Sequence, residues 1–149
     1  MKIRILTLLL MLGFFFTSCD NKNCSSVVCA PNSAFRFELV DTNEENLLSN
    51  GVLQISDIRI INLDSQRTIE FALINENNND IIEINSIVIP TGAVNYVIQA
   101  SEKDVFELLI TTERTDGECC DVIKFSELKI LNSEYLFDEN RGIYTFLVE

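Results

Sequence analysis

The chain has 149 residues, 23 of them acidic and 11 basic, which gives a formal net charge of −12 and room for one domain beside a targeting segment. The absence of histidine excludes a Ser-His-Asp or Cys-His nucleophile pair and any histidine metal ligand. The acidic balance argues against a nucleic-acid partner, because phosphate binding needs clustered Lys and Arg.

The first 18 residues predict a signal peptide. Lys2 and Arg4 form a positively charged start, and an almost uninterrupted apolar run follows over residues 5–16. Twelve residues in a helix cover about 18 Å, which is short of the ~30 Å hydrocarbon core of a bilayer. The segment is therefore expected to be removed rather than to remain as a membrane span.

The sequence Phe16-Thr17-Ser18-Cys19 resembles the lipobox of bacterial lipoproteins. The resemblance implies that residues 1–18 are cleaved and that Cys19 becomes a lipidated N-terminus. Several acyl chains together give stable membrane anchoring. The mature chain would then have 131 residues and a net charge of −14. An ordinary secretory signal with a chance cysteine nearby is the alternative.

Residues 19–33 are mostly polar and short, and they predict a lipidated tether to a domain at 34–149. From Ala34 onward, apolar and polar residues alternate with the period of two that is typical of strands. In chain order the β-type runs are 35–39, 58–60, 69–73, 82–84, 87–89, 96–98, 106–108, 122–131, 135–137 and 144–148. Short strands separated by turn signals predict an all-β fold, a single sandwich of about seven to nine mostly antiparallel strands, Ig-like or transthyretin-like.

Two local sequence patterns add detail to the predicted strands. Residues 101–110 could begin a helix capped by Ser101, but Phe106, Leu108 and Ile110 favour a strand. The last two runs predict a hairpin closed by residues 138–142.

The other four cysteines are Cys24, Cys29, Cys119 and Cys120. In an exported protein they allow three disulfide connectivities. A bridge between the adjacent Cys119 and Cys120 is unfavourable, because their Cα atoms are closer than disulfides prefer. We therefore expect bridges that connect the early pair to the late pair, each closing a loop of roughly 90 to 95 residues. A zinc site made by all four thiolates is the rival, although adjacent cysteines do not fit the usual ligand spacing.

These motifs together resemble a family. A lipobox, the sequence Cys-Ser-Ser-Val-Val-Cys at 24–29, a strand at 35–41 and the sequence Gly-Glu-Cys-Cys-Asp-Val at 117–122 are similar to those of small uncharacterised lipoproteins of Bacteroidetes-type bacteria. The resemblance implies a sandwich like transthyretin or the carboxypeptidase regulatory domain. It implies no activity.

The acidic loops are the remaining candidates for chemistry. Residues 41–52 begin like an EF-hand loop, but Asn46 stands where the turn needs Gly and Val52 where the bidentate Glu belongs. Residues 75–80 offer oxygen atoms that could hold calcium weakly, but a polar turn is favoured, since Asn tolerates the left-handed backbone. Asp116, Glu118 and Asp121 are interpreted as a solvated charged turn.

We therefore expect a non-enzymatic binding or structural module of the cell envelope, on the periplasmic or outer-surface face of the outer membrane. The lipid on Cys19 would attach it to the membrane, and its partner would be an envelope protein or a glycan. No catalytic residue, metal or cofactor is assigned. The alternatives are a glycan- or calcium-binding sandwich and, second, a hydrolase that uses a carboxylate pair.

Overall fold

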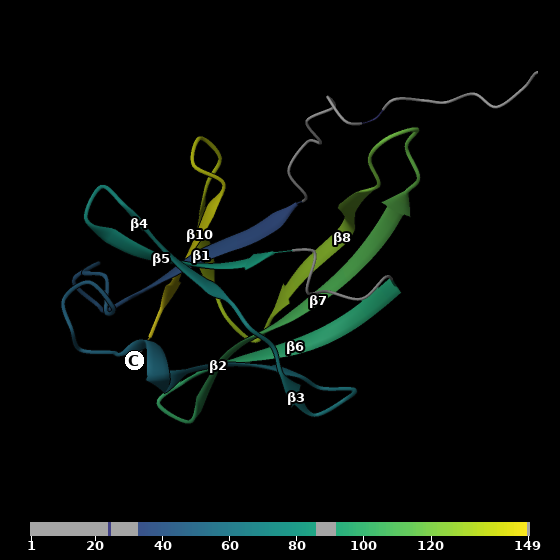
Figure 1. Cartoon of the computed structure of the whole chain (residues 1–149). Coiled ribbons are helices and arrows are strands. Elements are labelled where there is room, and N and C mark those ends of the chain that lie inside the picture. Colours follow the sequence, from purple (N-terminus) through teal and green to yellow (C-terminus); the bar gives the residue numbers. More distant parts are fainter. Residues whose placement is uncertain (1–23, 25–32, 86–91, 149) are drawn as a thin grey trace, which may run out of the picture.

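The computed structural model describes Cys24, residues 33–85 and residues 92–148 (Figure 1). Several predicted features lie outside the described residues: the signal peptide at 1–18, Cys19, Cys29 and the expected strand at 87–89.

Two five-stranded sheets pack face to face. Sheet A has the order β4 (Ala72–Glu76), β5 (Asn79–Asn85), β1 (Ala34–Val40), β10 (Ile143–Leu147) and β9 (Tyr135–Asp138). Sheet B has the order β3 (Arg67–Thr68), β2 (Ile58–Asn62), β6 (Gly92–Ala100), β7 (Lys103–Thr115) and β8 (Val122–Leu131). A 3-10 helix, η3 (Ile55–Asp57), precedes β2, and the described residues contain no α-helix. All strand pairs are antiparallel except β1 with β10, which is parallel.

The predicted all-β sandwich is thus confirmed. The described residues form ten strands rather than seven to nine. One of the ten, β3, has only two residues, which is too short for an alternating pattern to show.

Aromatic side chains fill the space between the sheets. Alternation along β1 buries Phe35, Phe37 and Leu39 on one face. The ring of Phe37 meets that of Phe106 edge to face at 5.3 Å, and Phe106 stacks on Phe146 at 3.8 Å. Such pairs add about 0.5–1.5 kcal/mol each beyond the burial of their area. The core therefore joins β1 and β10 of sheet A to β7 of sheet B.

Two-residue turns close two of the hairpins. Asn77 and Asn78 lie between β4 and β5 with φ values of 54° and 67°. Ser101 and Glu102 lie between β6 and β7 with φ values of 49° and 69°. Two successive residues with positive φ match the right-handed twist of hairpin strands. Ser101 thus belongs to a tight turn and β7 follows it, so the strand prediction for residues 101–110 is confirmed and the helix alternative is wrong.

The expected strand at 69–73 is only partly correct. Residues 69–71 are not in a strand, and β4 begins at Ala72. Here the chain crosses from β3 in sheet B to β4 in sheet A, while Ile69 and Phe71 pack against the core from this crossing. The alternating pattern indicates only that every second side chain is buried. It does not distinguish a β-strand from an extended segment that connects the two sheets.

The predicted hairpin at the end of the chain is confirmed. Asp138 pairs with Ile143 at its closed end, and the backbone N–H of Gly142 donates to the carbonyl of Asp138 at 2.7 Å. Gly142 has a φ of 64°, which a glycine adopts without strain.

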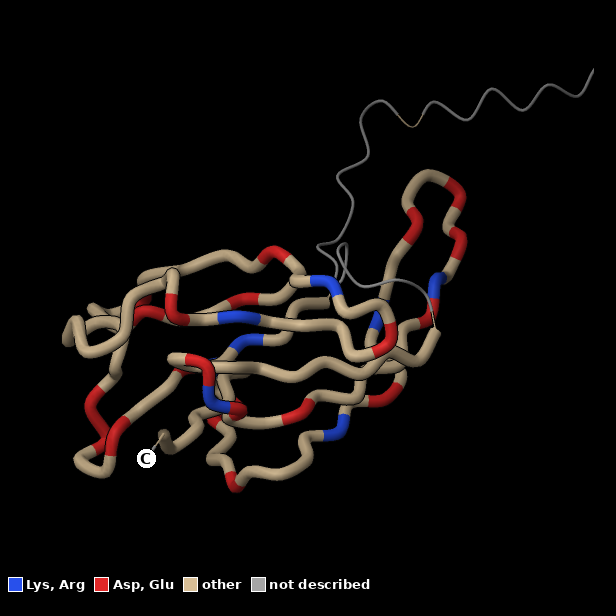
Figure 2. Tube along the Cα trace, turned by 90° about the horizontal axis from the view of Figure 1, so that it is seen from below, with Lys and Arg blue, Asp and Glu red and all other residues tan. Residues whose placement is uncertain are grey.

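Acidic side chains outnumber basic ones along the described trace (Figure 2). No helix in residues 33–85 or 92–148 has the length and hydrophobicity needed to cross a membrane.

Candidate functional site

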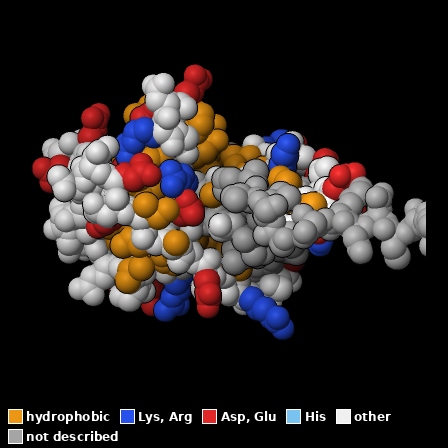
Figure 3. All heavy atoms as spheres, turned by 45° about the horizontal axis from the view of Figure 1, so that its top comes forward, with side chains coloured by type: hydrophobic (Ala, Val, Ile, Leu, Met, Phe, Trp, Pro, Cys, Tyr) orange, Lys and Arg blue, Asp and Glu red, His pale blue; other side chains and the backbone are white. Residues whose placement is uncertain are grey.

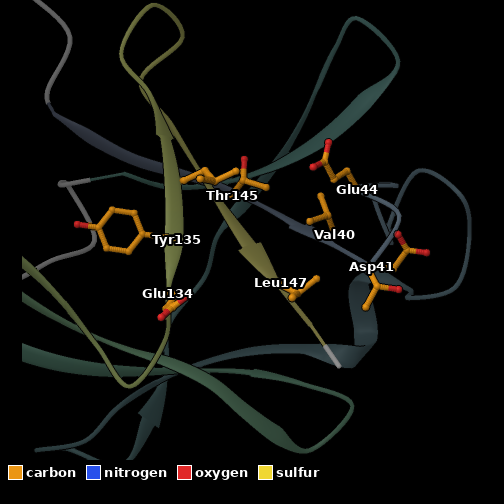
Figure 4. A pocket seen from close by; sticks show the side chains of 9 residues that line it. Val40, Asp41, Glu44, Glu134, Tyr135, Thr145 and Leu147 are labelled. Atoms are coloured by element: carbon orange, nitrogen blue, oxygen red, sulfur yellow. The ribbon is translucent and has the colours of Figure 1, made fainter.

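A groove of about 460 Å³ lies on the outer face of sheet A, beside β9 (Figure 4). The end of β1, the loop that follows it, β10 and β9 form its walls. The groove is lined by Val40, Asp41, Thr42, Glu44, Glu134, Tyr135, Leu136, Thr145 and Leu147.

The pairing of β1 with β10 and of β10 with β9 determines which residues form the floor of the groove. Val40 lies opposite Leu147, and Thr145 lies opposite Leu136. Because side chains alternate along a strand, all four point to the face of sheet A that is turned away from the core. Leu147 and Leu136 are 47% and 71% exposed, so the floor is apolar and accessible to a ligand.

The loop after β1 forms one rim. The Oδ1 atom of Asp41 accepts hydrogen bonds from the backbone N–H groups of Asn43 at 2.8 Å and Glu45 at 3.0 Å. These bonds, that from Glu45 first, lower the pKa of Asp41 below its ordinary value. Asp41 therefore stays ionised and is unsuited to act as a proton donor.

Asn46 fixes this loop to the sheet. Its Nδ2 group donates to the carbonyl of Asp80 at 2.9 Å and to Oε2 of Glu38 at 3.4 Å. Its Oδ1 atom accepts from the backbone N–H groups of Leu48 and Ser49. Glu38 is itself buried, and its Oε1 atom accepts from the hydroxyl of Thr145 at 3.0 Å. A polar network thus holds the rim next to the floor.

The other rim is the start of β9. Glu134 precedes the strand, and Tyr135 begins it. Figure 4 shows the Tyr135 ring on the far side of β9 from Val40 and Glu44, where it meets the ring of Tyr144 at 5.4 Å. Tyr135 lines the groove, but its ring is turned toward Tyr144 and away from Val40 and Glu44.

The charges around the groove have one sign. Asp41, Glu44 and Glu134 are carboxylates, and none of the nine lining residues is Lys or Arg. An apolar floor with a carboxylate rim suits a ligand that has both an apolar body and a positive charge.

The structure resolves part of the cysteine question. Cys24 and Cys119, 95 positions apart in sequence, form a disulfide, and Cys120 is disulfide-bonded as well. The expectation that the early pair is bridged to the late pair is confirmed for Cys24. The zinc alternative and the Cys119–Cys120 bridge are wrong, because the sulfur atoms of Cys24 and Cys119 are joined to each other. Cys29 lies outside the described residues.

The turn that carries Cys119 and Cys120 needs a glycine. A Cβ atom at Gly117 would lie 2.2 Å from the carbonyl oxygen of Cys120, so no other residue fits there without movement of the backbone. Nearby, the guanidinium of Arg114 pairs with Asp116 and Asp121. These exposed ion pairs agree with a solvated charged turn.

The Asn-rich segment at 75–80 is the hairpin turn that the sequence favours. The side chain of Asn75 donates to Oδ1 of Asp80 at 2.7 Å across the base of the turn. Within the described ranges, no group of three or more Cys, Asp or Glu side chains is arranged to hold a metal ion.

The lining of the groove was not predicted from the sequence. The signal in the sequence is the run Glu134-Tyr-Leu-Phe-Asp138, in which three large apolar residues follow one another between acids. A strand with apolar residues on both faces is either fully buried or an exposed edge, and only the sheet order distinguishes these cases.

Comparison with known proteins does not assign the chain to a family. No family model matches the chain, and no curated protein or solved structure matches it. Its function has to be inferred from the groove and from the motifs in the sequence.

Proposed function

We propose that the chain is a lipid-anchored, non-enzymatic module of a bacterial cell envelope that binds a positively charged partner in the groove beside β9. The main support is the lining of that groove, in which Asp41, Glu44 and Glu134 lie around an apolar floor and no lining residue is Lys or Arg. The anchor is supported by the sequence Phe16-Thr17-Ser18-Cys19.

The disulfide supports an orientation in which the groove points away from the membrane. Only five peptide units separate Cys19 from Cys24, and an extended chain of that length reaches about 18 Å at most. Because Cys24 is bonded to Cys119, the turn between β7 and β8 would be held within that reach of the lipid.

The groove lies at the other end of β1 from this turn. The N–H of Ser33, next to the start of β1, donates to the carbonyl of Ile123, while the groove begins at Val40, where β1 ends. A seven-residue strand is about 23 Å long. The proposed orientation thus leaves the groove open to a partner beyond the membrane surface.

Metabolic labelling with radioactive palmitate tests the anchor. We expect label in the parent chain, none in Cys19→Ala, and normal label in Cys24→Ser, which removes a nearby thiol that is not the acceptor. Equal labelling of the parent and Cys19→Ala would disprove the anchor.

Binding of a fluorescent hexalysine peptide tests the groove. We expect Glu44→Gln with Glu134→Gln to weaken binding about fivefold at low salt, because two carboxylates lose their charge. Glu102→Gln with Glu139→Gln is the matched control, since it removes two exposed carboxylates outside the lining. Equal effects of the two double variants would show that only the overall charge matters, and the groove proposal would be wrong.

A further inference from the structure

The edge of sheet A at β9 is exposed and apolar. β9 pairs with β10 on one side, and no strand of the described residues pairs with its other side. Tyr135, Leu136 and Phe137 are 46%, 71% and 46% exposed. Alternate residues of such an edge direct unpaired N–H and C=O groups outward. The strand thus has both free main-chain partners and apolar surface on its two faces.

Two of the other three edge strands are guarded in ways that β9 is not, whereas β4, the other edge of sheet A, has five residues and an exposed Leu73 but carries Glu76 at its end. β8, the edge of sheet B, carries exposed Lys124 and Lys129. β3 has only two residues, one of them Arg67. Lysines and very short strands are the usual devices that keep a sheet edge from pairing with another chain. Among residues 135–137 there is no charge at all. Figure 3 shows that hydrophobic side chains also gather in patches among charged ones on the face that it draws.

We propose that β9 accepts an additional β-strand from an extended segment of a partner protein, in which apolar residues alternate with Lys or Arg. This inference rests on the proposed function and names the class of partner. Main-chain hydrogen bonds to the β9 edge supply affinity in this mode of recognition, and alternate side chains supply specificity.

The two faces of β9 determine which positions of the partner segment are basic and which are apolar. Leu136 faces the groove, and so would every second side chain of an added strand. A Lys there lays its methylene stem over Leu136 and Leu147 and directs its ammonium group to the carboxylates on the rim. The other side chains lie beside Tyr135 and Phe137, where apolar residues are favoured.

Charge distinguishes this partner from a second copy of the chain. Glu134 precedes the apolar run and Asp138 ends β9, and the whole chain has a net charge of −12. Pairing of β9 with β9 from another copy would bring acidic side chains against an acidic groove. A basic segment instead gains from the same charges.

A designed octapeptide, four repeats of Val-Lys, tests the proposal. The full chain is used as the cell delivers it, in lipid nanodiscs if it is acylated and in buffer if it is not, so the result does not depend on the anchor. We expect the peptide to bind and to slow amide hydrogen exchange at residues 135–138. A fully N-methylated version, which keeps the charge but cannot pair through its main chain, is expected to bind about tenfold more weakly. A Val-Glu version is expected not to bind.

Leu136→Lys gives β9 the guard that β8 already has, and Val52→Lys is its control. Val52 is 67% exposed and lies outside both β9 and the groove lining, so both variants replace an exposed apolar residue with the same charge. We expect Leu136→Lys to weaken the Val-Lys peptide about tenfold and Val52→Lys to change it less than about twofold.

Three outcomes would overturn strand addition. The first is equal binding of the N-methylated peptide together with a loss in the Glu44→Gln, Glu134→Gln variant, which leaves a groove for cations without a strand site. The second is equal behaviour of Leu136→Lys and Val52→Lys. The third is a dimer of the chain that Leu136→Lys dissociates while the peptide has no effect, which identifies a second copy as the occupant. If neither hexalysine nor the Val-Lys peptide binds, the proposed function is wrong as well.

Discussion

Asn46→Ala should destabilise the sandwich strongly, because Asn46 connects the groove's loop to two strands. The side chain is only 7% exposed, and its loss removes two buried hydrogen bonds, the one donated to Oε2 of Glu38 and the one accepted from the N–H of Leu48. A buried polar group left without a partner costs at least about 1–1.5 kcal/mol. The bonds to the Asp80 carbonyl and to the Ser49 backbone and hydroxyl are partly buried, so water can replace them at little cost. We therefore expect a loss of about 2–3 kcal/mol in the free energy of unfolding.

The expected shift in melting temperature follows from the size of the domain. A domain of about 115 residues has an unfolding entropy of about 0.24 kcal/mol/K. A loss of about 2.5 kcal/mol then lowers Tm by about 10 °C. Circular dichroism at the strand minimum during heating measures this shift.

Asn75→Ala is the matched control, since Asn75 also bonds Asp80, but at the exposed end of a hairpin. It should lower Tm by less than about 2 °C, as surface substitutions usually do. If Asn46→Ala and Asn75→Ala melt within about 2 °C of each other, burial does not decide the strength of these hydrogen bonds and the reasoning fails.

Three further predictions concern other parts of the sandwich. Burial raises the pKa of Tyr96, whose hydroxyl is buried without a well-formed hydrogen bond to a described residue, so Tyr96→Phe should leave stability unchanged or raise it by up to about 1 kcal/mol in urea unfolding; a loss above 1 kcal/mol would contradict this. The pKa of Asp41 is lower in the folded state, so its carboxylate stabilises the fold above its unfolded value of 3.8, and this contribution is lost as pH falls through the folded value. Asp41→Asn should therefore show a flatter loss of stability below about pH 4, and parallel curves would refute the effect. Reduction of both Cys24–Cys119 and the expected Cys29–Cys120 bridge opens the long loop and should cost about 4–5 kcal/mol, whereas Cys24→Ser alone should cost less, because the second bridge still closes nearly the same loop. Non-reducing peptide mapping should find Cys29 joined to Cys120, and a free thiol at Cys29 would rule this out.

The strands could be predicted from the sequence because burial and alternation coincide along them. In β1, every second residue from Phe35 to Leu39 enters the core, and the pattern reports this directly. The turn at Asn77 and Asn78 was predictable for a similar reason, since few residues tolerate two positive φ angles in succession.

The groove could not be predicted because it depends on which strands become neighbours. Leu147 and Leu136 are separated in sequence from Val40, and only the pairing of β1 with β10 and of β10 with β9 brings them together. Alternation assigns each of these residues to a face of its own strand. It carries no information about the order of strands in the sheet or about the strand that lies at the edge.

The parallel pairing of β1 with β10 has a consequence for the order in which the chain can fold. β1 is the first strand of the sandwich and β10 the last, yet they lie side by side in the middle of sheet A, and the N–H of Val148 donates to the carbonyl of Val40 at 2.9 Å. Until β10 leaves the ribosome, sheet A can therefore form no further than β4, β5 and β1, because β9 pairs only with β10 among the described strands. A chain that cannot complete its central sheet during synthesis keeps the core face of β1 uncovered on the side of β10 until synthesis ends.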